Sequence, residues 1–212
     1  MDSANSIFQN VFSADGGFQR PAYSRRVTGI DLTEEFVQVA ESLTRLVKLD
    51  DRASFRRASA LEMPFAAETF DGAYMIHVGM NLTDKDGVFR EVGRVLKRGG
   101  RFTIFDLLRA GPGALRFPVP WALTEETSFV ADGARYRAAL EAAGFELETE
   151  RSHRAFAIEF TERFAARIAS GGPPALGLHV LMGEKTPLLL KNVLGGMTEG
   201  MLDPVEMAAK KK

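Results

Sequence analysis

Short apolar runs rich in β-branched residues alternate with segments of helical spacing, and this alternation constrains the fold more than any other feature. The run RVTGIDL at 26–32 contains Val27 and Thr28 and ends in an acid, which is typical of a buried parallel strand. Apolar residues then recur at helical spacing, so we expect a helix from Thr33, whose hydroxyl suits an N-cap, to about Leu49. The βαβαβ order predicts an α/β fold, a doubly wound, Rossmann-like, mostly parallel sheet.

The rest of the chain continues the alternation and indicates one domain. We expect further strands at 54–58, 71–78, 101–108, 145–150 and 204–209, and helices at 84–97, 134–143, 155–169 and 187–197. The last strand is expected at an edge of the sheet, and the two helices before it form a helical insertion that could cover a ligand pocket. The domain would comprise a degenerate first strand and glycine loop (1–25), a core (26–152), and a helical cover with the closing strand (153–212).

Composition excludes several classes of partner. Lys and Arg number 27 against 28 Asp and Glu, so no basic field favours nucleic acid or anionic lipid. Cysteine is absent, which removes disulfides and thiolate sites. Apolar runs stay well below the roughly 18 residues of a membrane helix, and the first residues lack the pattern of a secretory signal. We expect a cytoplasmic protein with no membrane or nucleic-acid partner, and, because His153 and His179 are not spaced as metal ligands with any pair of carboxylates, no metal.

Four segments in order carry a family resemblance over roughly residues 6–150. They are RVTGIDL, ALEMPFAAETFDGAY, HVGMN and EVGRVLKRGGRFTIFD. This order resembles the class I S-adenosylmethionine-dependent methyltransferases, particularly the small-molecule branch that methylates glycine, sarcosine and phosphoethanolamine. The resemblance implies S-adenosylmethionine as cofactor and methyl transfer to a small amine, hydroxyl or activated carbon.

The resemblance also implies which residues hold the cofactor. Asp31, at the end of its strand, would accept hydrogen bonds from the ribose hydroxyls, and capping of the following helix is the structural alternative. Ser59 stands where the family usually has an acid for the adenine amine, and a hydroxyl accepts more weakly than a carboxylate. Met63, Pro64 and Phe65 would sandwich the adenine ring or, as we favour, merely pack. The full cofactor set is Ser13, Gly16, Asp31, Leu32, Ser59, Ala60, Leu61 and His77.

The glycine loop departs from the family pattern. Aligning backwards from RVTGID puts NVFSADGG on a loop of the type DxGxGxG, with Phe12 and Ala14 in place of glycines and only Gly16 and Gly17 kept. The next segment contains Pro21 and is short for a helix. Three explanations stay open: a non-catalytic homologue, a fragment or frame-shifted product with a non-native first segment, or a rearranged loop that still binds cofactor. The alternative function is therefore a non-catalytic or truncated homologue that no longer binds cofactor.

Methyl transfer needs alignment of an acceptor more than a catalytic triad. We expect His77 to contact cofactor or acceptor as a catalytic residue, with a sheet-bonded neutral histidine as the alternative. Asn81, also assigned to catalysis, and Asp106 could orient an amine or act as structural caps. Trp121 could attract a methylated amine by cation–π contact, but we favour a loop anchor. Other residues that could line the cavity are Phe117, Phe129, His179 and Met182.

Two other enzyme classes fit less well. A nicotinamide dehydrogenase would share the acid after the second strand. The glycine spacing of this chain does not match that of a dinucleotide-binding loop, and the PFAAETFD segment gives this alternative no support. A nucleic-acid methyltransferase lacks support because there is no basic stripe with interleaved aromatic residues. A small-molecule substrate is therefore the expected partner.

Overall fold

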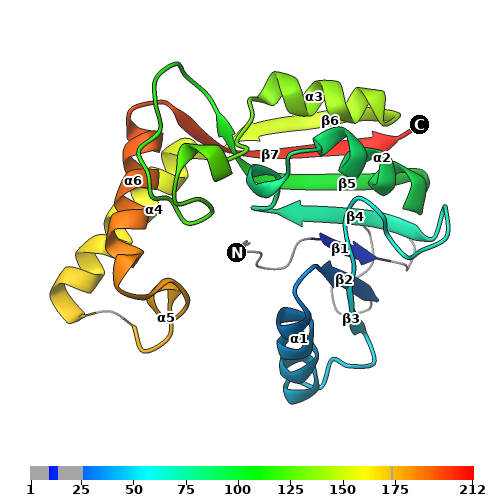
Figure 1. Ribbon diagram of the computed structural model, residues 1–212, viewed down its shortest axis with the longest axis horizontal. Coiled ribbons are helices and arrows are strands. Elements are labelled where there is room, and N and C mark those ends of the chain that lie inside the picture. The colour runs from blue at the N-terminus through cyan, green and yellow to red at the C-terminus, as the bar shows by residue number, and fades with distance from the viewer. Residues whose placement is uncertain (1–9, 14–25, 173) are drawn as a thin grey trace.

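The computed structural model describes residues 10–13, 26–172 and 174–212, and all structural statements below refer to them (Figure 1). Its strands are β1 (Asn10–Ser13), β2 (Val27–Asp31), β3 (Ala53–Arg57), β4 (Phe70–Ile76), β5 (Leu96–Arg109), β6 (Phe145–Ser152) and β7 (Leu202–Lys211). Its α-helices are α1 (Glu34–Leu46), α2 (Lys85–Val95), α3 (Gly133–Ala142), α4 (Arg154–Gly171), α5 (Leu178–Met182) and α6 (Thr186–Thr198). Short 3-10 helices are η2 (Gly79–Asn81), η3 (Glu125–Thr127) and η4 (Gly183–Lys185). None of the described helices is long and apolar enough to span a membrane.

The strands form one seven-stranded sheet in the order β3-β2-β1-β4-β5-β7-β6 (Figure 1). Strands β2 and β3 are parallel, as are β4 and β5, whereas β1 is antiparallel to β2 and β4, and β7 is antiparallel to β5 and β6. Five of the seven described strands, β2 to β6, therefore run in one direction. The expected Rossmann-like, mostly parallel α/β fold is confirmed, with the helical insertion α4 to α6 between β6 and β7.

The prediction that the last strand is an edge strand is wrong. β7 lies between β5 and β6, and β6 forms the edge. Buried Val205, Met207 and Ala209 contribute to the main core from β7. The outer strand β6 carries the polar, partly or fully exposed Glu146 and Glu150, as suits a solvated edge.

The central strand β1 also differs from expectation. The alignment with the glycine loop treats Asn10 to Gly17 as strand end and loop, but residues 10–13 are themselves a strand, and it runs opposite to its neighbours. Ser13 pairs with Val27 and Gly72, at the amino ends of β2 and β4. An antiparallel neighbour needs no crossover helix, which agrees with the short link to β2. Gly16 lies outside the described residues.

The main core lies between one face of the sheet and helices α2 and α3. Met75, Phe102 and Ile104 project from β4 and β5 and are at most 1% exposed, against buried Phe89 from α2 and Tyr136 from α3. The Phe89 ring meets those of Phe102 and Tyr136 edge to face, with centroids 5.3 and 5.9 Å apart. This packing fixes β4 and β5, whose carboxyl ends carry candidate site residues.

A second, smaller cluster joins the helical insertion to the sheet. It consists of Met80, Leu107, Met197 and Leu202, with α6 and the partly buried Trp121 packed around them. The Trp121 indole Nε1 donates to Ser128 Oγ at 3.0 Å. The ring thus contacts the core and a neighbouring loop, in keeping with the favoured loop-anchor role.

Candidate functional site

The carboxyl ends of β2, β3, β4 and β5 share one edge of the sheet because these strands run in the same direction, and ligands of open α/β sheets bind at such an edge. Asp31 ends β2, Ser59 follows β3 and His77 follows β4. The His77 backbone N–H donates to Phe105 O at 2.8 Å, which sets the end of β4 level with Asp106 in β5. Four predicted residues are thus placed at one edge.

Ser13 is not at this edge. Because β1 runs antiparallel, Ser13 lies at the amino ends of the neighbouring strands, and Asn10 is the β1 residue that pairs beside Asp31, opposite Ile30. The expectation that Ser13 and Asp31 both hold the cofactor requires a first strand parallel to β2, and β1 is antiparallel to it. The structure separates the two residues by the length of β1.

Asp31 is 3% exposed, and its Oδ1 accepts a hydrogen bond from the Thr33 backbone N–H at 2.7 Å. Thr33 occupies the N-cap of α1 but makes no side-chain capping bond, so the expected hydroxyl cap is not formed, and Asp31 instead holds the backbone of the residue at which the helix begins. The next residue, Leu32, is half exposed, and its carbonyl accepts from Arg57 Nε at 3.2 Å. A carboxylate offers about four acceptor positions, so this bond is compatible with ribose binding.

The loop after β3 brings the three residues expected at the adenine end together. Ser59 Oγ accepts from the Leu61 backbone N–H at 3.1 Å, and Ser59 forms a short bridge with Glu62. Ala60 is buried in the core, whereas Leu61 is 48% exposed. Leu61 is thus the one apolar side chain of this turn that is open to a ligand.

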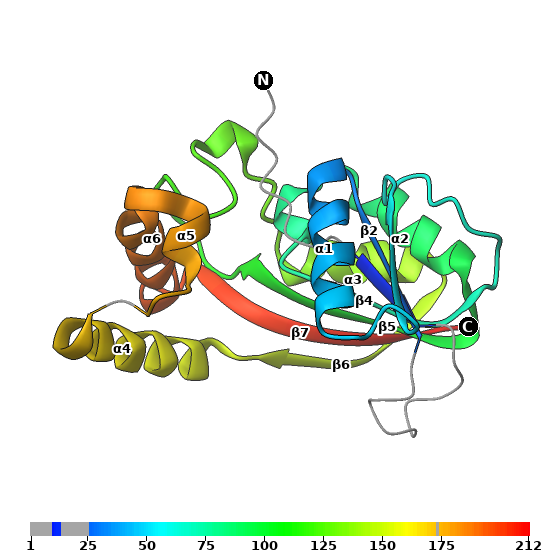
Figure 2. The same ribbon diagram turned by 90° about the horizontal axis from the view of Figure 1, so that it is seen from below.

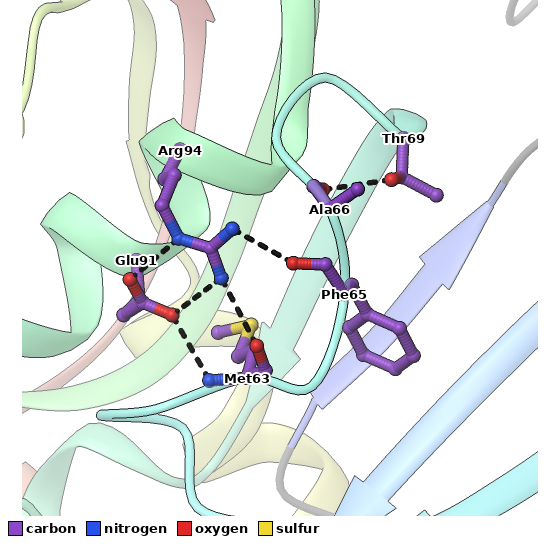
Figure 3. Close-up of polar contacts among 6 residues, drawn as sticks. All are labelled: Met63, Phe65, Ala66, Thr69, Glu91 and Arg94. Atoms are coloured by element: carbon purple, nitrogen blue, oxygen red, sulfur yellow. Dashed lines mark hydrogen bonds and ion pairs between the residues drawn. The ribbon is translucent and has the colours of Figure 1, made fainter.

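An ion pair that sequence analysis missed holds the rest of this loop (Figure 3). Arg94 Nε and Nη2 donate to the two carboxylate oxygens of Glu91 at 2.8 Å each, and its other bonds reach Phe65 O at 2.7 Å and Met63 O at 3.0 Å. Glu91 also accepts from Met63 N at 2.9 Å. Hydrogen bonding to Arg94 lowers the pKa of Glu91, so the pair stays charged at neutral pH.

The side chains of this loop pack as favoured. Met63 is 3% exposed within the core, and the Phe65 ring lies edge-on to Phe70 with centroids 5.0 Å apart. The Arg56 guanidinium lies over the Phe65 ring, 5.5 Å from the ring centroid. The only hint of the Glu91–Arg94 pair in the sequence is its i,i+3 spacing on a helix, which many surface pairs share.

His77 is exposed at the end of β4 and has a left-handed backbone, with φ of 54°. Its ring lies edge-on to Phe105 at a centroid distance of 5.0 Å. Partial desolvation by the surrounding protein lowers its pKa, so the imidazole is neutral at pH 7.

Asn81, the last residue of η2, is half-buried, and its backbone N–H donates to Val78 O at 2.8 Å.

Asp106 is fully buried and acts as a structural anchor. Its Oδ2 accepts from the Tyr136 hydroxyl at 2.6 Å, and its carboxylate also accepts from the backbone N–H groups of Leu107 and Gly79. Burial raises the Asp106 pKa to about 6, although these bonds act against the rise. Asp106 therefore has the structural capping role, because its carboxylate accepts from the Gly79 backbone N–H at the start of η2.

Lys85 completes this cluster and was not identified from the sequence. It is 3% exposed, and its Nζ donates to Leu82 O at 2.9 Å and to Phe129 O at 2.7 Å. Desolvation lowers its pKa to about 8, while attraction to Asp106 partly opposes this. A lysine flanked by two aspartates reads as a solvated helix start, so only the tertiary fold reveals its burial.

The residues expected to line an acceptor cavity fall into two groups. Phe129 donates its backbone N–H to Met80 O at 2.9 Å, so its loop lies against η2, near Trp121. His179 and Met182 lie on α5, which contacts α6 and η4 instead. Among the described residues no group of three or more His, Cys, Asp or Glu is arranged to hold a metal ion.

The residues at this edge fit the nucleoside half of S-adenosylmethionine. A buried carboxylate ends β2, and the loop after β3 offers a hydroxyl, backbone groups and an exposed Leu61. Vicinal ribose hydroxyls are donors that suit a carboxylate, and adenine suits an apolar turn with backbone polar groups. The methionine half would depend on a glycine loop that lies outside the described residues.

Comparisons with known proteins agree with this fold. Residues 14–104 match the family model of a methyltransferase domain. Methyltransferase GfsG from Streptomyces halstedii is 36% identical over 85 residues, which is 40% of this chain and 31% of that protein. The 27-O-demethylrifamycin SV methyltransferase of Amycolatopsis mediterranei is 32% identical over 131 residues, 58% of this chain and 46% of that protein. The matched segments thus span less than half the length of these relatives.

Two solved structures share the fold at low identity. A putative sarcosine dimethylglycine methyltransferase from Galdieria sulphuraria aligns with a TM-score of 0.72 and 18% identity over 87% of this chain and 69% of its own. The [4+2]-cyclase SpnF aligns with a TM-score of 0.67 and 22% identity over 90% of this chain and 68% of its own. Residues 14–104 are therefore similar in sequence to a methyltransferase domain, and the chain shares the fold of these two solved proteins.

Proposed function

We propose that this chain transfers a methyl group from S-adenosylmethionine to a small-molecule acceptor. The observation that carries the proposal is the buried Asp31 carboxylate at the end of β2, inside the segment that matches a methyltransferase domain. Asp31 and Leu32 would hold the ribose, and Ser59, Ala60 and Leu61 would hold the adenine. When bound, the cofactor supplies an electrophilic methyl group, so the protein mainly orients the acceptor.

A hydroxyl is the acceptor that we favour over an amine or an activated carbon. Relatives of this chain are named for O-methylation, among them the erythromycin 3''-O-methyltransferase of Saccharopolyspora erythraea, 32% identical over 83 residues, 39% of this chain and 27% of that protein. A hydroxyl must lose a proton as it is methylated, which calls for a nearby base. His77 has a lowered pKa and is therefore available as a neutral base at pH 7.

The roles of His77 and Asn81 follow from this chemistry. His77 would accept the hydroxyl proton, and Asn81, one short 3-10 turn further on, would orient the acceptor through its amide. The buried Asp106 supports both, since it holds the Gly79 backbone between them. Ser13 has no part in the proposal because it lies at the opposite edge.

The test is turnover with a panel of hydroxyl, amine and carbon acceptors, followed as formation of S-adenosylhomocysteine. We expect hydroxyl compounds to be methylated, with a rate that falls as His77 becomes protonated below its ordinary pKa of 6.5. His77→Gln should lower kcat by about 100-fold or more, the usual contribution of a general base, and remove the acid limb of the pH profile. His179→Gln, on α5, is the matched control and should keep both the wild-type kcat and the acid limb of the pH profile. Turnover of amines alone, or an unchanged profile in His77→Gln, would overturn the proposed chemistry.

A further inference from the structure

Helix α4 carries a stripe of phenylalanine rings that the rest of the chain does not cover. Phe156, Phe160 and Phe164 are spaced by four residues, and neighbouring rings stack with centroids 6.2 and 6.3 Å apart. Phe156 is 61% and Phe160 54% exposed. None of the 18 residues of α4 is buried. We call these three side chains the phenylalanine stripe.

The position of α4 leaves this stripe accessible. The helix extends beyond the sheet as part of the helical insertion (Figures 1 and 2). Ala157 and Ile158, near its start, are partly buried against the second cluster, but the residues that follow are mostly exposed. Helices in water gain most of their stability from packing an apolar face, so an uncovered stripe of this kind calls for a partner.

A row of charges runs beside the stripe and has opposite signs at its two ends. Glu159 lies at the amino-terminal end, and Arg163 and Arg167 follow at spacings of four residues. Arg163 lies 3.4 Å from Glu159, and Arg167 lies over the Phe164 ring at 5.1 Å from its centroid. An antiparallel copy of the same row would therefore set negative against positive charge.

The geometry of the helix makes the charges and rings of α4 complementary to those of a second, antiparallel copy of α4. With a rise of about 1.5 Å per residue, a two-fold axis level with Thr161 sets Glu159 of one copy directly opposite Arg163 of the other, at the same height. The same axis staggers the phenylalanine rings of the two copies by about 3 Å, so that each ring enters a gap of the facing stripe. Side chains spaced by four residues form the ridges that interdigitate in the commonest class of helix packing.

We propose that the phenylalanine stripe of α4 is a homodimer interface in which two copies of α4 pack antiparallel about a two-fold axis at Thr161. An isologous contact of this kind needs the same patch on both partners, and α4 provides it. Six half-exposed rings would bury on the order of 500 Å² of apolar surface, which is less than a standard specific interface and suits a weak, transient contact. The dimer should therefore be weak, with a Kd in the micromolar range.

The test is sedimentation velocity of the full chain from about 1 to 300 μM, a range that brackets a micromolar Kd. The wild type should shift from monomer to dimer, and Phe160→Glu should stay monomeric throughout. Circular dichroism of Phe160→Glu should match the wild type, since the side chain is exposed. A wild type that is monomeric at all concentrations, or a Phe160→Glu variant that still dimerises, would overturn the proposal.

Charge reversal tests the antiparallel register without altering the stripe. Glu159→Arg should weaken dimerisation by about tenfold, because two opposite-charge pairs become like-charge pairs, and the double variant Glu159→Arg/Arg163→Glu should restore it. The matched control is Glu41→Arg on α1, where Glu41 and Arg45 form the same kind of i,i+4 pair, and it should leave the dimer unchanged. A double variant that stays as weak as Glu159→Arg would exclude the proposed register.

Discussion

The Tyr136 hydroxyl donates a 2.6 Å hydrogen bond to the Asp106 carboxylate inside the core, and this bond ties α3 to the end of β5. The Gly79 backbone N–H reaches the same carboxylate, and a side chain at Gly79 would collide with both groups. The turn that carries His77 to Asn81 is therefore positioned by the buried Tyr136–Asp106 pair.

Tyr136→Phe should destabilise the protein by about 1.5–3 kcal/mol, because a carboxylate that stays buried loses a donor. Denaturant unfolding at pH 7 measures this as a lower midpoint with an unchanged slope. Tyr74→Phe is the control, since that ring is 39% exposed on the opposite face of the sheet, and it should change stability by less than about 0.5 kcal/mol. Equal effects of the two variants would contradict a structural role for the buried pair.

Asp106 also predicts a pH dependence of stability. Its pKa is about 6 in the folded protein against 3.8 ordinarily, so in that window the folded state keeps a proton that the unfolded state has lost. The free energy of unfolding should therefore fall as pH rises from 3.8 to 6, by on the order of 3 kcal/mol from this group.

Carboxylates with lowered pKa values, such as Glu91, act in the opposite direction, so the measured quantity is the difference between wild type and Asp106→Asn. Unfolding free energies at a series of pH values should show the wild type losing stability relative to Asp106→Asn between pH 4 and 6.5. A difference that is constant or rises with pH would show that folding does not raise the pKa of Asp106.

Arg94 should affect cofactor affinity without touching the cofactor. Arg94→Met removes the donors to Met63 O and Phe65 O and frees the loop that follows Leu61, so we expect binding of S-adenosylhomocysteine to weaken about three- to tenfold. Titration calorimetry checks this. The control Arg101→Met removes a comparable partly exposed ion pair, which joins β5 to Glu148 of β6, and should leave affinity unchanged. If both variants bind equally well, the loop does not depend on Arg94.

Local pattern predicted most of the elements between 26 and 171. The runs around Val27 and Phe102 form strands, and the helices expected at 84–97 and 134–143 are α2 and α3. Such features depend on residues within a few positions of each other, which a single sequence displays. Most strand ends differ from those expected by one or two residues, but β5 begins at Leu96, five residues before its expected start and within the expected helix 84–97.

Long-range pairing was the part that local pattern could not determine. The direction of β1 and the interior place of β7 depend on which strands pair, and Ser13 was misplaced for that reason. The burial of Lys85 against Phe129 O likewise joins residues 44 positions apart. Asp31, Ser59 and His77 reached the same edge because their strands are parallel, as the alternating pattern implied.

Binding of S-adenosylhomocysteine to the purified chain by titration calorimetry, with Asp31→Asn compared against Asp51→Asn, tests the central claim most directly. Asp31 is 3% exposed at the edge of the site, whereas Asp51 lies on the exposed turn before β3. The account predicts micromolar binding by the wild type and by Asp51→Asn, and binding at least tenfold weaker in Asp31→Asn, because a charged acceptor to the ribose is lost. A folded wild type that does not bind, or an Asp31→Asn variant that binds as well as Asp51→Asn, would contradict it.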